Sequence, residues 1–396
     1  MGYNEFAKNI NLIKEIRAVA HNNTILRQIV AFLPRHEFDS LAKDYHQGQK
    51  FRSFTRWTQF MVMFIGQLSG RKSLRDIVMN VAAQSSKLYH LAIRPCSRAT
   101  LARVNEKQPA ALFEAVFFKL LERCRQVAPA HRFKFKSKLY LLDATTIDLC
   151  LSLFPWATFR KTKGAVKLHV GLDADGYLPA FVALSEGKTH ESNWASALKL
   201  PRGSFVVFDR GFNDYAWYQS LMKNGVFFVT RLKSNAVLSH GPKRAGRKAE
   251  GISEDREIFL GKIPEALRMV CYHDPETGKE LRFITNADHL SAKTIADLYK
   301  ERWQIELFFK WIKQNLKVKT FLGTSKNAVL TQIWIALCVY LLLAFLKFKA
   351  KIDLSMQQML RLLQLNLFER RDLLALLKPP EPQLVECRQF SLFKKL

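Results

Sequence analysis

The sequence lacks the cysteine patterns that hold small domains together. Its six cysteines form no C-x-x-C pair and no Cys/His group at the spacing of a zinc site. They are Cys96, Cys124, Cys150, Cys271, Cys338 and Cys387. A disulfide scaffold and a zinc module are therefore excluded, and we expect free thiols in a reducing cytoplasm.

Segments that direct a chain to a membrane are also missing. The first residues, MGYNEFAKNI, lack the basic segment followed by an apolar segment that marks a signal peptide. Phe6 stands where the myristoylation motif requires Ser or Thr. The longest apolar run, residues 333–346, has 14 residues, fewer than the roughly 18 to 20 that span a bilayer. This run predicts a buried helix, and we expect no membrane partner. Internal repeats and low-complexity tracts are absent too.

Acidic residues are scarce. The chain has 34 Asp plus Glu against 62 Lys plus Arg, a formal net charge of +28 and a pI near 10.0. An excess of this size predicts a polyanionic partner. An anionic membrane surface is the alternative, but the basic residues form no polybasic anchor or amphipathic terminal helix. Nucleic acid is therefore the expected partner of a chain whose 396 residues suffice for two or three domains.

The first third of the chain predicts helices only. Residues 1–130 contain no convincing alternating run, and segments 73–82 and 97–107 each begin with a serine that can cap a helix. The second segment is a candidate recognition helix for a DNA groove, although a plain packing helix fits its pattern equally well. Its groove-facing residues would be Arg98, Thr100, Arg103 and Asn105.

Strands and helices alternate in the middle of the chain. Apolar strands are expected at 138–150, 166–173, 177–185, 204–211 and 226–232, with helices near 193–200 and at 213–224. Strands that end at an acid and lead into a helix predict an α/β sheet with its site where the strands end. Residues 234–288 predict a small β insertion with strands at 257–260, 268–273 and 280–285. Closing helices are expected at 326–349, 355–366 and 370–377.

Residues 291–316 predict one long helix with a polar stripe. At about 100° per residue, one carboxylate, one phenol and three cations share an arc of roughly 80°. They are Tyr299, Arg302, Glu306, Lys310 and Lys313. Apolar residues should pack on both sides of this stripe, with Trp303, Leu307 and Trp311 on one side. A solvated face of i,i+4 ion pairs is the alternative, but three cations beside one acid favour a binding site.

Three acids occupy unusual positions. Asp143 lies inside an apolar strand, where a carboxylate is unfavourable unless it is ligated or hydrogen-bonded. Asp209 ends another strand, and Glu306 lies in the polar stripe. Carboxylates without His or Cys suit Mg²⁺, and two such ions roughly 3.5 to 4 Å apart can support an in-line phosphoryl displacement. The sequence therefore predicts a metal-dependent site that acts on nucleic acid.

Each acid also has a structural alternative. Asp143 could cap a backbone amide or form an ion pair, and Asp148, on the opposite face of the strand, could be the catalytic acid in its place. Asp209 could form an ion pair with Arg210. Glu301 competes with Glu306 but points away from the stripe. In GKTHESNW, His190 could lie near the substrate or in a surface loop.

Several motifs carry a family resemblance. Tyr299, Arg302, Glu306 and Lys313 spell Y-x2-R-x3-E-x6-K, preceded by D-A-T-T at 143–146, D-R-G-F at 209–212 and R-F-I-T-N at 282–286. Over about 140–345 the chain resembles bacterial insertion-sequence transposases of the DDE type, in the insertion-sequence-four family. The helical N-terminus is similar to that of some members.

This resemblance implies a fold and a site. The core would be ribonuclease-H-like, interrupted by a β insertion before Glu306, with an all-α N-terminal domain and C-terminal helices. Asp143, Asp209 and Glu306 would bind two Mg²⁺ ions, with Mn²⁺ as a substitute. Tyr299, Arg302 and Lys313 would hold DNA phosphates, and the position of Lys310 leads us to add it to them.

The resemblance also implies a reaction and partners. Water would cut one strand at the element's end, and the freed 3′-hydroxyl would attack, often through a hairpin, before paired ends join target DNA. The partner would be double-stranded DNA bound by a homodimer in the bacterial cytoplasm at the nucleoid, with no small-molecule cofactor. The alternatives are a non-transposing Mg²⁺-dependent nuclease or resolvase, which would not need the Tyr/Arg/Lys clamp, and a catalytically silent DNA-binding derivative, which the three acids disfavour.

The expected domains follow from these assignments. Residues 1–130 would form the DNA-binding domain, with Arg98 and Arg103 as candidates for end recognition. Residues 131–233 and 289–350 would form the catalytic core, 234–288 the β insertion, and 351–396 a C-terminal helical region.

Overall fold

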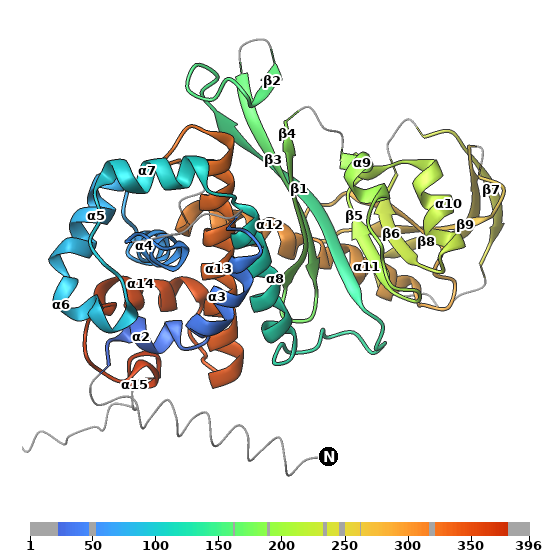
Figure 1. The fold of residues 1–396 in the computed structure, drawn as a ribbon. Coiled ribbons are helices and arrows are strands. Elements are labelled where there is room, and N and C mark those ends of the chain that lie inside the picture. The colour runs from blue at the N-terminus through green and yellow to red at the C-terminus, as the bar shows by residue number, and fades with distance from the viewer. Residues whose placement is uncertain are drawn as a thin grey trace, which may run out of the picture.

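The protein has an α/β fold, in which a helical body lies beside a ten-stranded sheet (Figure 1). The structure is a computed structural model that describes residues 23–46, 53–160, 163–187, 191–232, 236–244, 250–261, 263–316 and 321–378. The α/β class predicted from the sequence is therefore confirmed.

The N-terminal helices begin where their serine caps predict. The helices are α2 (Ile25–Val30), α3 (Arg35–Lys43), α4 (Arg56–Leu68), α5 (Leu74–Ala83), α6 (Ser85–Leu88), the 3₁₀ turn η1 (Tyr89–Leu91), α7 (Arg98–Lys107) and α8 (Ala111–Arg125). Ser73 accepts the amide of Asp76 at the start of α5, and Ser97 caps α7 in the same way. The prediction that Asn105 faces a groove is wrong. It is buried, because its side chain accepts a 2.8 Å hydrogen bond from the Gln59 amide.

The C-terminal helices complete the helical body. They are α13 (Lys326–Ala350), α14 (Met356–Asn366) and α15 (Leu373–Leu377). The amides of Ile25 and Leu26 donate to the carbonyls of Glu369 and Leu367, which joins the two ends of the described chain. The figure shows helices from both ends of the sequence packed side by side (Figure 1).

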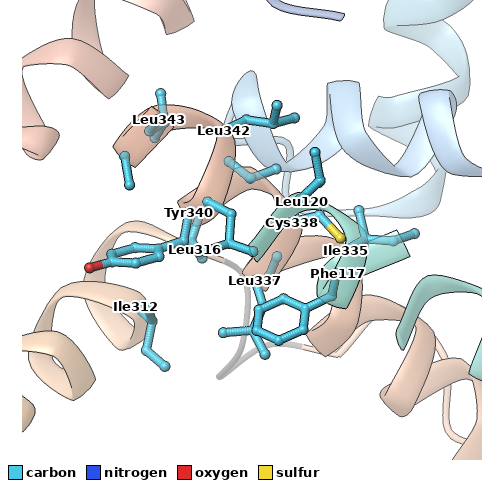
Figure 2. Close-up of a cluster of buried hydrophobic side chains, with 14 of the residues drawn as sticks. Phe117, Leu120, Ile312, Leu316, Ile335, Leu337, Cys338, Tyr340, Leu342 and Leu343 are labelled. Carbon is cyan, nitrogen blue, oxygen red and sulfur yellow. The ribbon is translucent and has the colours of Figure 1, made fainter. Parts of the chain in front are cut away.

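Helix α13 is the centre of this body. Its length and composition would allow it to cross a membrane, but 89% of its most apolar window is buried inside the protein. The buried helix predicted from the apolar run is therefore confirmed. Figure 2 shows Leu337 and Tyr340 of α13 among side chains from α8 and the segment 303–316, including Phe117 and Ile312.

The sheet is built around three parallel neighbours. Its strands are β1 (Leu139–Leu149), β2 (Thr158–Arg160), β3 (Lys163–Asp173), β4 (Leu178–Glu186), β5 (Phe205–Phe208), β6 (Phe227–Arg231), β7 (Leu238–Lys243), β8 (Ile252–Leu260), β9 (Leu267–His273) and β10 (Glu280–Thr285). Strands β1, β5 and β6 run parallel. The order is β2-β3-β1-β5-β6-β10-β9-β8-β7, with β4 paired to β3. The strands predicted at 166–173 and 177–185 pair with each other as the antiparallel hairpin β3–β4.

The β insertion extends the central sheet. Strand β10 pairs with β6, and β9, β8 and β7 follow it outward. Strands β2 and β7 were not predicted, because β2 has three residues and β7 reads LSHGPK without apolar alternation. The strands predicted at 268–273 and 280–285 are confirmed.

The two faces of the sheet have separate cores. Leu141 of β1 belongs to the core shared with the helical body, whereas its neighbour Leu142 packs on the opposite face with residues of α9 (Glu191–Ser196) and α10 (Tyr215–Lys223). This alternation follows from the two-residue period of a strand. A side chain at the end of a central strand can therefore be approached from both faces.

The predicted helix over 291–316 is wrong in one respect. The segment forms two helices, α11 (Ala292–Glu301) and α12 (Trp303–Asn315), with Arg302 in a turn between them. The Arg302 amide donates to the Tyr299 carbonyl, and the Ile305 amide donates to the Arg302 carbonyl. These three-residue bonds tighten the chain locally. Arg302 keeps helical angles, with φ −52° and ψ −28°, so the break is confined to one residue.

Candidate acid site at the ends of the central strands

Three elements deliver the three predicted acids. Strands β1 and β5 pair in parallel as far as Leu142 and Phe208, and Asp143 and Asp209 are the next residues. Asp209 caps the 3₁₀ turn η2 (Arg210–Phe212). Glu306 lies in the first turn of α12, which packs against β1. Asp143 thus lies inside β1 at the point where its pairing with β5 ends, Asp209 follows β5, and Glu306 comes from the helix that covers one face.

Asp143 lies in a negative environment. Its side chain is 19% exposed, and burial raises its pKa to about 7. The charges of Asp209 and Glu191 raise this pKa further, whereas the Ala144 amide and the Arg302 guanidinium oppose the rise. The Ala144 amide donates to Asp143 Oδ1 over 2.8 Å. The acids near Asp143 are therefore incompletely balanced, and an added cation would favour their ionised forms.

Asp209 is oriented by its own turn. Its Oδ1 accepts the Gly211 amide over 2.7 Å. Within the described chain Arg210 is exposed and makes no ion pair with Asp209, so the structural alternative for this acid is not seen. One oxygen of Asp209 is therefore fixed by the turn that follows β5.

Arg302 joins Glu306 to Asp143. Its Nη2 lies 2.5 Å from Glu306 Oε1 and its Nη1 lies 3.7 Å from Asp143 Oδ2. The guanidinium also lies 5.6 Å from the centre of the Tyr299 ring. Burial opposes the charge on Arg302, but Tyr299, Glu306 and Asp143 outweigh it and raise the Arg302 pKa. A fixed positive group therefore stands between two of the three acids.

The other residues of the predicted stripe differ in their contacts. Tyr299 is buried and packs on Phe283 of β10 at 4.7 Å between ring centres, and burial raises its pKa. Lys313 donates to Thr145 Oγ1 and to the Thr146 carbonyl of β1. Lys310 is exposed. The structure therefore places Lys313 against β1, Arg302 beside Asp143 and Tyr299 against β10, and it leaves Lys310 facing solvent.

The predicted apolar flank of the stripe is wrong on one side. Trp303 is 56% exposed and Leu307 is 40% exposed. The buried face of α12 consists of Ile305, Phe308, Phe309 and Ile312, and it suffices to attach the helix. Trp311 does pack as expected, 5.3 Å from the Tyr340 ring centre.

Among the described residues, no three His, Cys, Asp or Glu side chains are grouped in a way that could hold one metal ion. The acids nevertheless fit a hard divalent cation in chemistry, because they offer oxygen only. Asp143, with its raised pKa beside Asp209 and Glu191, shows the unbalanced negative charge that such an ion would neutralise. Glu306 is held by Arg302 and would have to exchange that partner for an ion.

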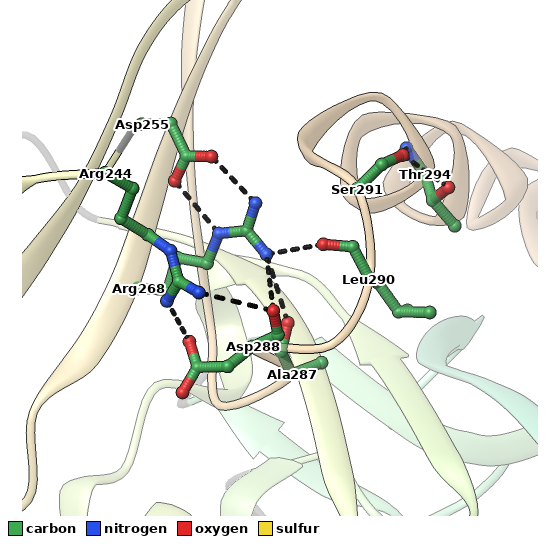
Figure 3. A network of polar contacts seen from close by, with 8 residues as sticks. All are labelled: Arg244, Asp255, Arg268, Ala287, Asp288, Leu290, Ser291 and Thr294. Carbon is green, nitrogen blue, oxygen red and sulfur yellow. Dashed lines mark hydrogen bonds and ion pairs between the residues drawn. The ribbon is translucent and has the colours of Figure 1, made fainter. Parts of the chain in front are cut away.

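Two polar networks fix the two ends of α11. Figure 3 shows Arg268, which donates to both oxygens of Asp255 and to the Leu290 carbonyl just before α11. At the far end of α11, Glu301 is 4% exposed, pairs with Arg132 at 2.6 Å and accepts the Tyr177 hydroxyl. Glu301 thus points away from the acids, as predicted, and holds the helix from which Arg302 extends.

Sequence reasoning missed several groups near the acids. Glu191 of α9 lies beside Asp209 across Gly211 and pairs with Lys167 at 3.3 Å. Arg231, at the end of β6, interacts electrostatically with Tyr299. Glu191 follows His190, which was the residue noted from the sequence and which lies outside the described residues. The only available signal was an acid in the loop between the strand predicted at 177–185 and the helix predicted near 193–200.

Arg98 and Arg103 are not part of this site. Both are exposed on α7, which lies in the helical body and not at the strand ends (Figure 1).

Comparisons with known proteins agree with the motifs. A family model described as a transposase DDE domain matches residues 134–342, more than half of the chain, and a model described as a domain of unknown function matches residues 21–94. A Sinorhizobium fredii protein named as a transposase is 33% identical over 292 residues, covering 71% of this chain and 80% of that protein. A Geobacillus stearothermophilus protein named as a transposase of an insertion sequence element is 29% identical, covering 63% and 67%.

Among solved structures, a piggyBac transposase synaptic complex with hairpin DNA shares 11% identity, covering 86% of this chain and 77% of that one, with a TM-score of 0.45. The family model and the identity to the Sinorhizobium fredii protein decide the assignment. This chain belongs to the DDE-type transposases of bacterial insertion sequences.

Proposed function

We propose that the protein is a DNA transposase that cuts an insertion sequence at its terminal inverted repeats and joins the freed 3′-hydroxyl ends to target DNA. The observation that carries this proposal is the link among the three acids: Arg302 contacts both Asp143 and Glu306, and the charge of Asp209 acts on Asp143. The net charge of +28 supports DNA as the partner. Each step, cutting or joining, is an in-line displacement at phosphorus, so one set of acids serves all of them.

The acids would hold divalent ions, which would bind the reacting phosphodiester. When bound, Mg²⁺ would activate the attacking oxygen and stabilise the leaving oxygen. Asp143 and Asp209 would hold such an ion from neighbouring strands, and Glu306 would complete the site from α12. Mn²⁺ would substitute, since it accepts the same oxygen ligands.

The neighbouring cations and the phenol hold the DNA. Arg302 and Lys313 would bind phosphate oxygens of the cleaved end, and Tyr299, kept neutral by its raised pKa, would donate a hydrogen bond. Lys310, which faces solvent, would contact phosphates farther from the cut. With these roles the chain would be an insertion-sequence-four transposase with a ribonuclease-H-like core, a family in which a hairpin on the element is a frequent intermediate.

The remaining parts of the chain would serve DNA recognition and assembly. Residues 1–130 would bind the element ends, with Arg98 and Arg103 toward the DNA, residues 131–233 and 289–350 would form the core around the 234–288 insertion, and 351–396 would close it. Two copies would act together on paired ends at the bacterial nucleoid. No small-molecule cofactor is needed for this chemistry.

The test uses a matched pair of variants in β1. Asp143 is proposed to act in catalysis, whereas Asp148 of the same strand is exposed. The terminal repeats are first identified in the DNA on both sides of the gene, as short inverted repeats bounded by a direct duplication. With those ends as substrate, Asp143→Asn and Glu306→Gln should bind DNA but abolish Mg²⁺-dependent nicking, and Asp148→Asn should nick normally.

A second assay separates transposase from nuclease. Pre-cleaved ends with a free 3′-hydroxyl are incubated with a target plasmid, and joined products are counted. A transposase joins them, whereas a nuclease or resolvase on the same fold yields hydrolysis products alone. Normal nicking by Asp143→Asn would remove that acid from the mechanism, and a lack of joined products would refute the transposase assignment.

A further inference from the structure

A fourth acid faces the same strand ends from the other side of the sheet. A β-carbon built on Gly211 would lie 2.7 Å from Glu191 Oε2 and 2.9 Å from Asp209 Oδ1. Two carboxylate oxygens from different elements therefore converge over a residue that has no side chain. Gly211 has no positive φ, so the backbone does not explain why a glycine stands there. A side chain at position 211 would instead collide with Glu191 Oε2 and Asp209 Oδ1.

The position of Glu191 is fixed by its surroundings. It begins the six-residue helix α9, which packs against η2. Trp194, one turn later, stacks on His169 of β3 with ring centres 5.2 Å apart. His169 is fully buried, and its Nε2 lies 2.8 Å from the Ser185 hydroxyl. The stacked pair attaches α9 to the sheet, so Glu191 is held next to Asp209.

The charges around Glu191 are unevenly balanced. Lys167 pairs with Glu191 Oε1 at 3.3 Å, whereas Oε2 is the oxygen that converges with Asp209 over Gly211. The negative charges of Glu191 and Asp209 meet over one glycine, and like charges placed in this way oppose each other unless a cation lies near them.

We propose that Glu191 is a fourth acid of this site and that, with Asp209, it holds a divalent cation on the side of β5 that faces α9. This proposal rests on the proposed function, whose reaction requires such ions. Mg²⁺ usually keeps several waters and takes one or two protein carboxylates, so two converging oxygens are sufficient for it. Glu191 can act directly or through a water of the ion. Lys167 supplies positive charge to Glu191 in the absence of the ion.

This assignment makes opposite predictions for the two members of one ion pair. Glu191→Gln removes a ligand charge and should weaken cation binding, whereas Lys167→Met removes a competing cation and should strengthen it. A merely structural ion pair would respond differently, because both variants would lower stability and neither would change cation affinity. Gly211→Ala should weaken binding as well, since its methyl group would displace the flexible end of Glu191.

The experiment measures Mn²⁺ binding to the full chain without DNA, by the electron paramagnetic resonance signal of free Mn²⁺. We expect Glu191→Gln to weaken binding by about tenfold or more, in the range seen for groups that support metal ligands. Lys167→Met should tighten it several-fold. Glu186→Gln, at the exposed end of β4, is the matched control and should bind as the wild type does. Thermal unfolding of each variant verifies that it is folded.

Parallel measurements on Asp143→Asn and Asp209→Asn separate two kinds of failure. If both weaken Mn²⁺ binding but Glu191→Gln and Gly211→Ala match Glu186→Gln, the acid site stands and the role of Glu191 is refuted. If Asp143→Asn and Asp209→Asn also bind Mn²⁺ normally, the acid site fails, and the inference about Glu191 fails with it.

Discussion

Arg302 Nη2 lies 2.5 Å from Glu306 Oε1, and the same guanidinium places Nη1 3.7 Å from Asp143 Oδ2. One fixed cation thus stands between two acids that we propose as metal-binding. Arg302 and a divalent ion would compete for the same carboxylate of Glu306. Since Arg302 is also proposed to hold a DNA phosphate, an ion that takes Glu306 would release the guanidinium for that phosphate. Metal binding and end binding would then favour each other.

Replacing Arg302 should therefore raise the affinity for Mn²⁺ and lower the affinity for a DNA end. In Arg302→Ala, Mn²⁺ affinity without DNA should rise several-fold, because Glu306 loses its competing cation. Affinity for a pre-cleaved DNA end should fall by about tenfold, as expected for a lost charge-assisted hydrogen bond. The first effect is measured by paramagnetic resonance and the second by fluorescence anisotropy. The exposed Arg210→Ala serves as the control, and weaker Mn²⁺ binding in Arg302→Ala would contradict the competition.

The pKa of Asp143 predicts a pH dependence of stability without metal. This pKa is about 7 in the folded protein against an ordinary value of 3.8, so between these values the folded state holds a proton that the unfolded state has lost. The free energy of unfolding should therefore fall as the pH rises from about 4 to about 7, and this group lowers it by at most about 4 kcal/mol.

Asp143→Asn removes this dependence. In EDTA, urea unfolding should show the variant gaining stability relative to the wild type between pH 5 and pH 8. The exposed Asp148→Asn controls for removing one carboxylate from β1. A difference between Asp143→Asn and wild type that is the same at pH 5 and pH 8 would contradict the raised pKa.

Local signals in the sequence were sufficient for many elements. Ser73 and Ser97 gave the starts of α5 and α7, because a capping hydroxyl acts on amides only two or three residues away. The apolar strand around Asp143 is equally local, and so is the break between the strands predicted at 166–173 and 177–185, where Gly176 takes a φ of +69°. The spacing of Tyr299, Arg302 and Glu306 likewise needed no tertiary information.

The features that sequence reasoning missed depend on distant contacts. Asn105 is buried because Gln59, 46 residues away, binds it. Trp303 and Leu307 are exposed because only one face of α12 meets the sheet and α13, and periodicity alone does not say how much of a helix is covered. Glu191 reaches Asp209 only through the folding of β3 and β4.

The buried Glu301 should contribute to stability. Its carboxylate is 4% exposed, pairs with Arg132 and accepts the Tyr177 hydroxyl, so Glu301→Ala removes two partners at once. We expect a loss of about 2 to 3 kcal/mol in urea unfolding, because the half-buried Tyr177 hydroxyl would be left without its acceptor. Glu280→Ala, exposed on β10, should change stability by less than about 0.5 kcal/mol. Equal losses in the two variants would show that the Glu301 network is not stabilising.

Lys313 has two assignments that salt can separate. Its ammonium group bonds to Thr145 and to the Thr146 carbonyl of β1, and it is also proposed to hold a phosphate of the cleaved end. If it binds phosphate, Lys313→Met should weaken end binding and make the plot of log affinity against log salt shallower by about one unit, because one fewer counterion is released.

Lys310→Met gives the comparison for this prediction. Lys310 is exposed on the same helix three residues earlier, and as the more distant contact it should lower the slope by less. Anisotropy titrations of a pre-cleaved end at several salt concentrations, together with thermal unfolding, decide the case. A Lys313→Met protein that melts earlier but keeps the wild-type salt slope would assign this lysine to the support of β1 alone, because a purely internal hydrogen bond releases no counterions from DNA.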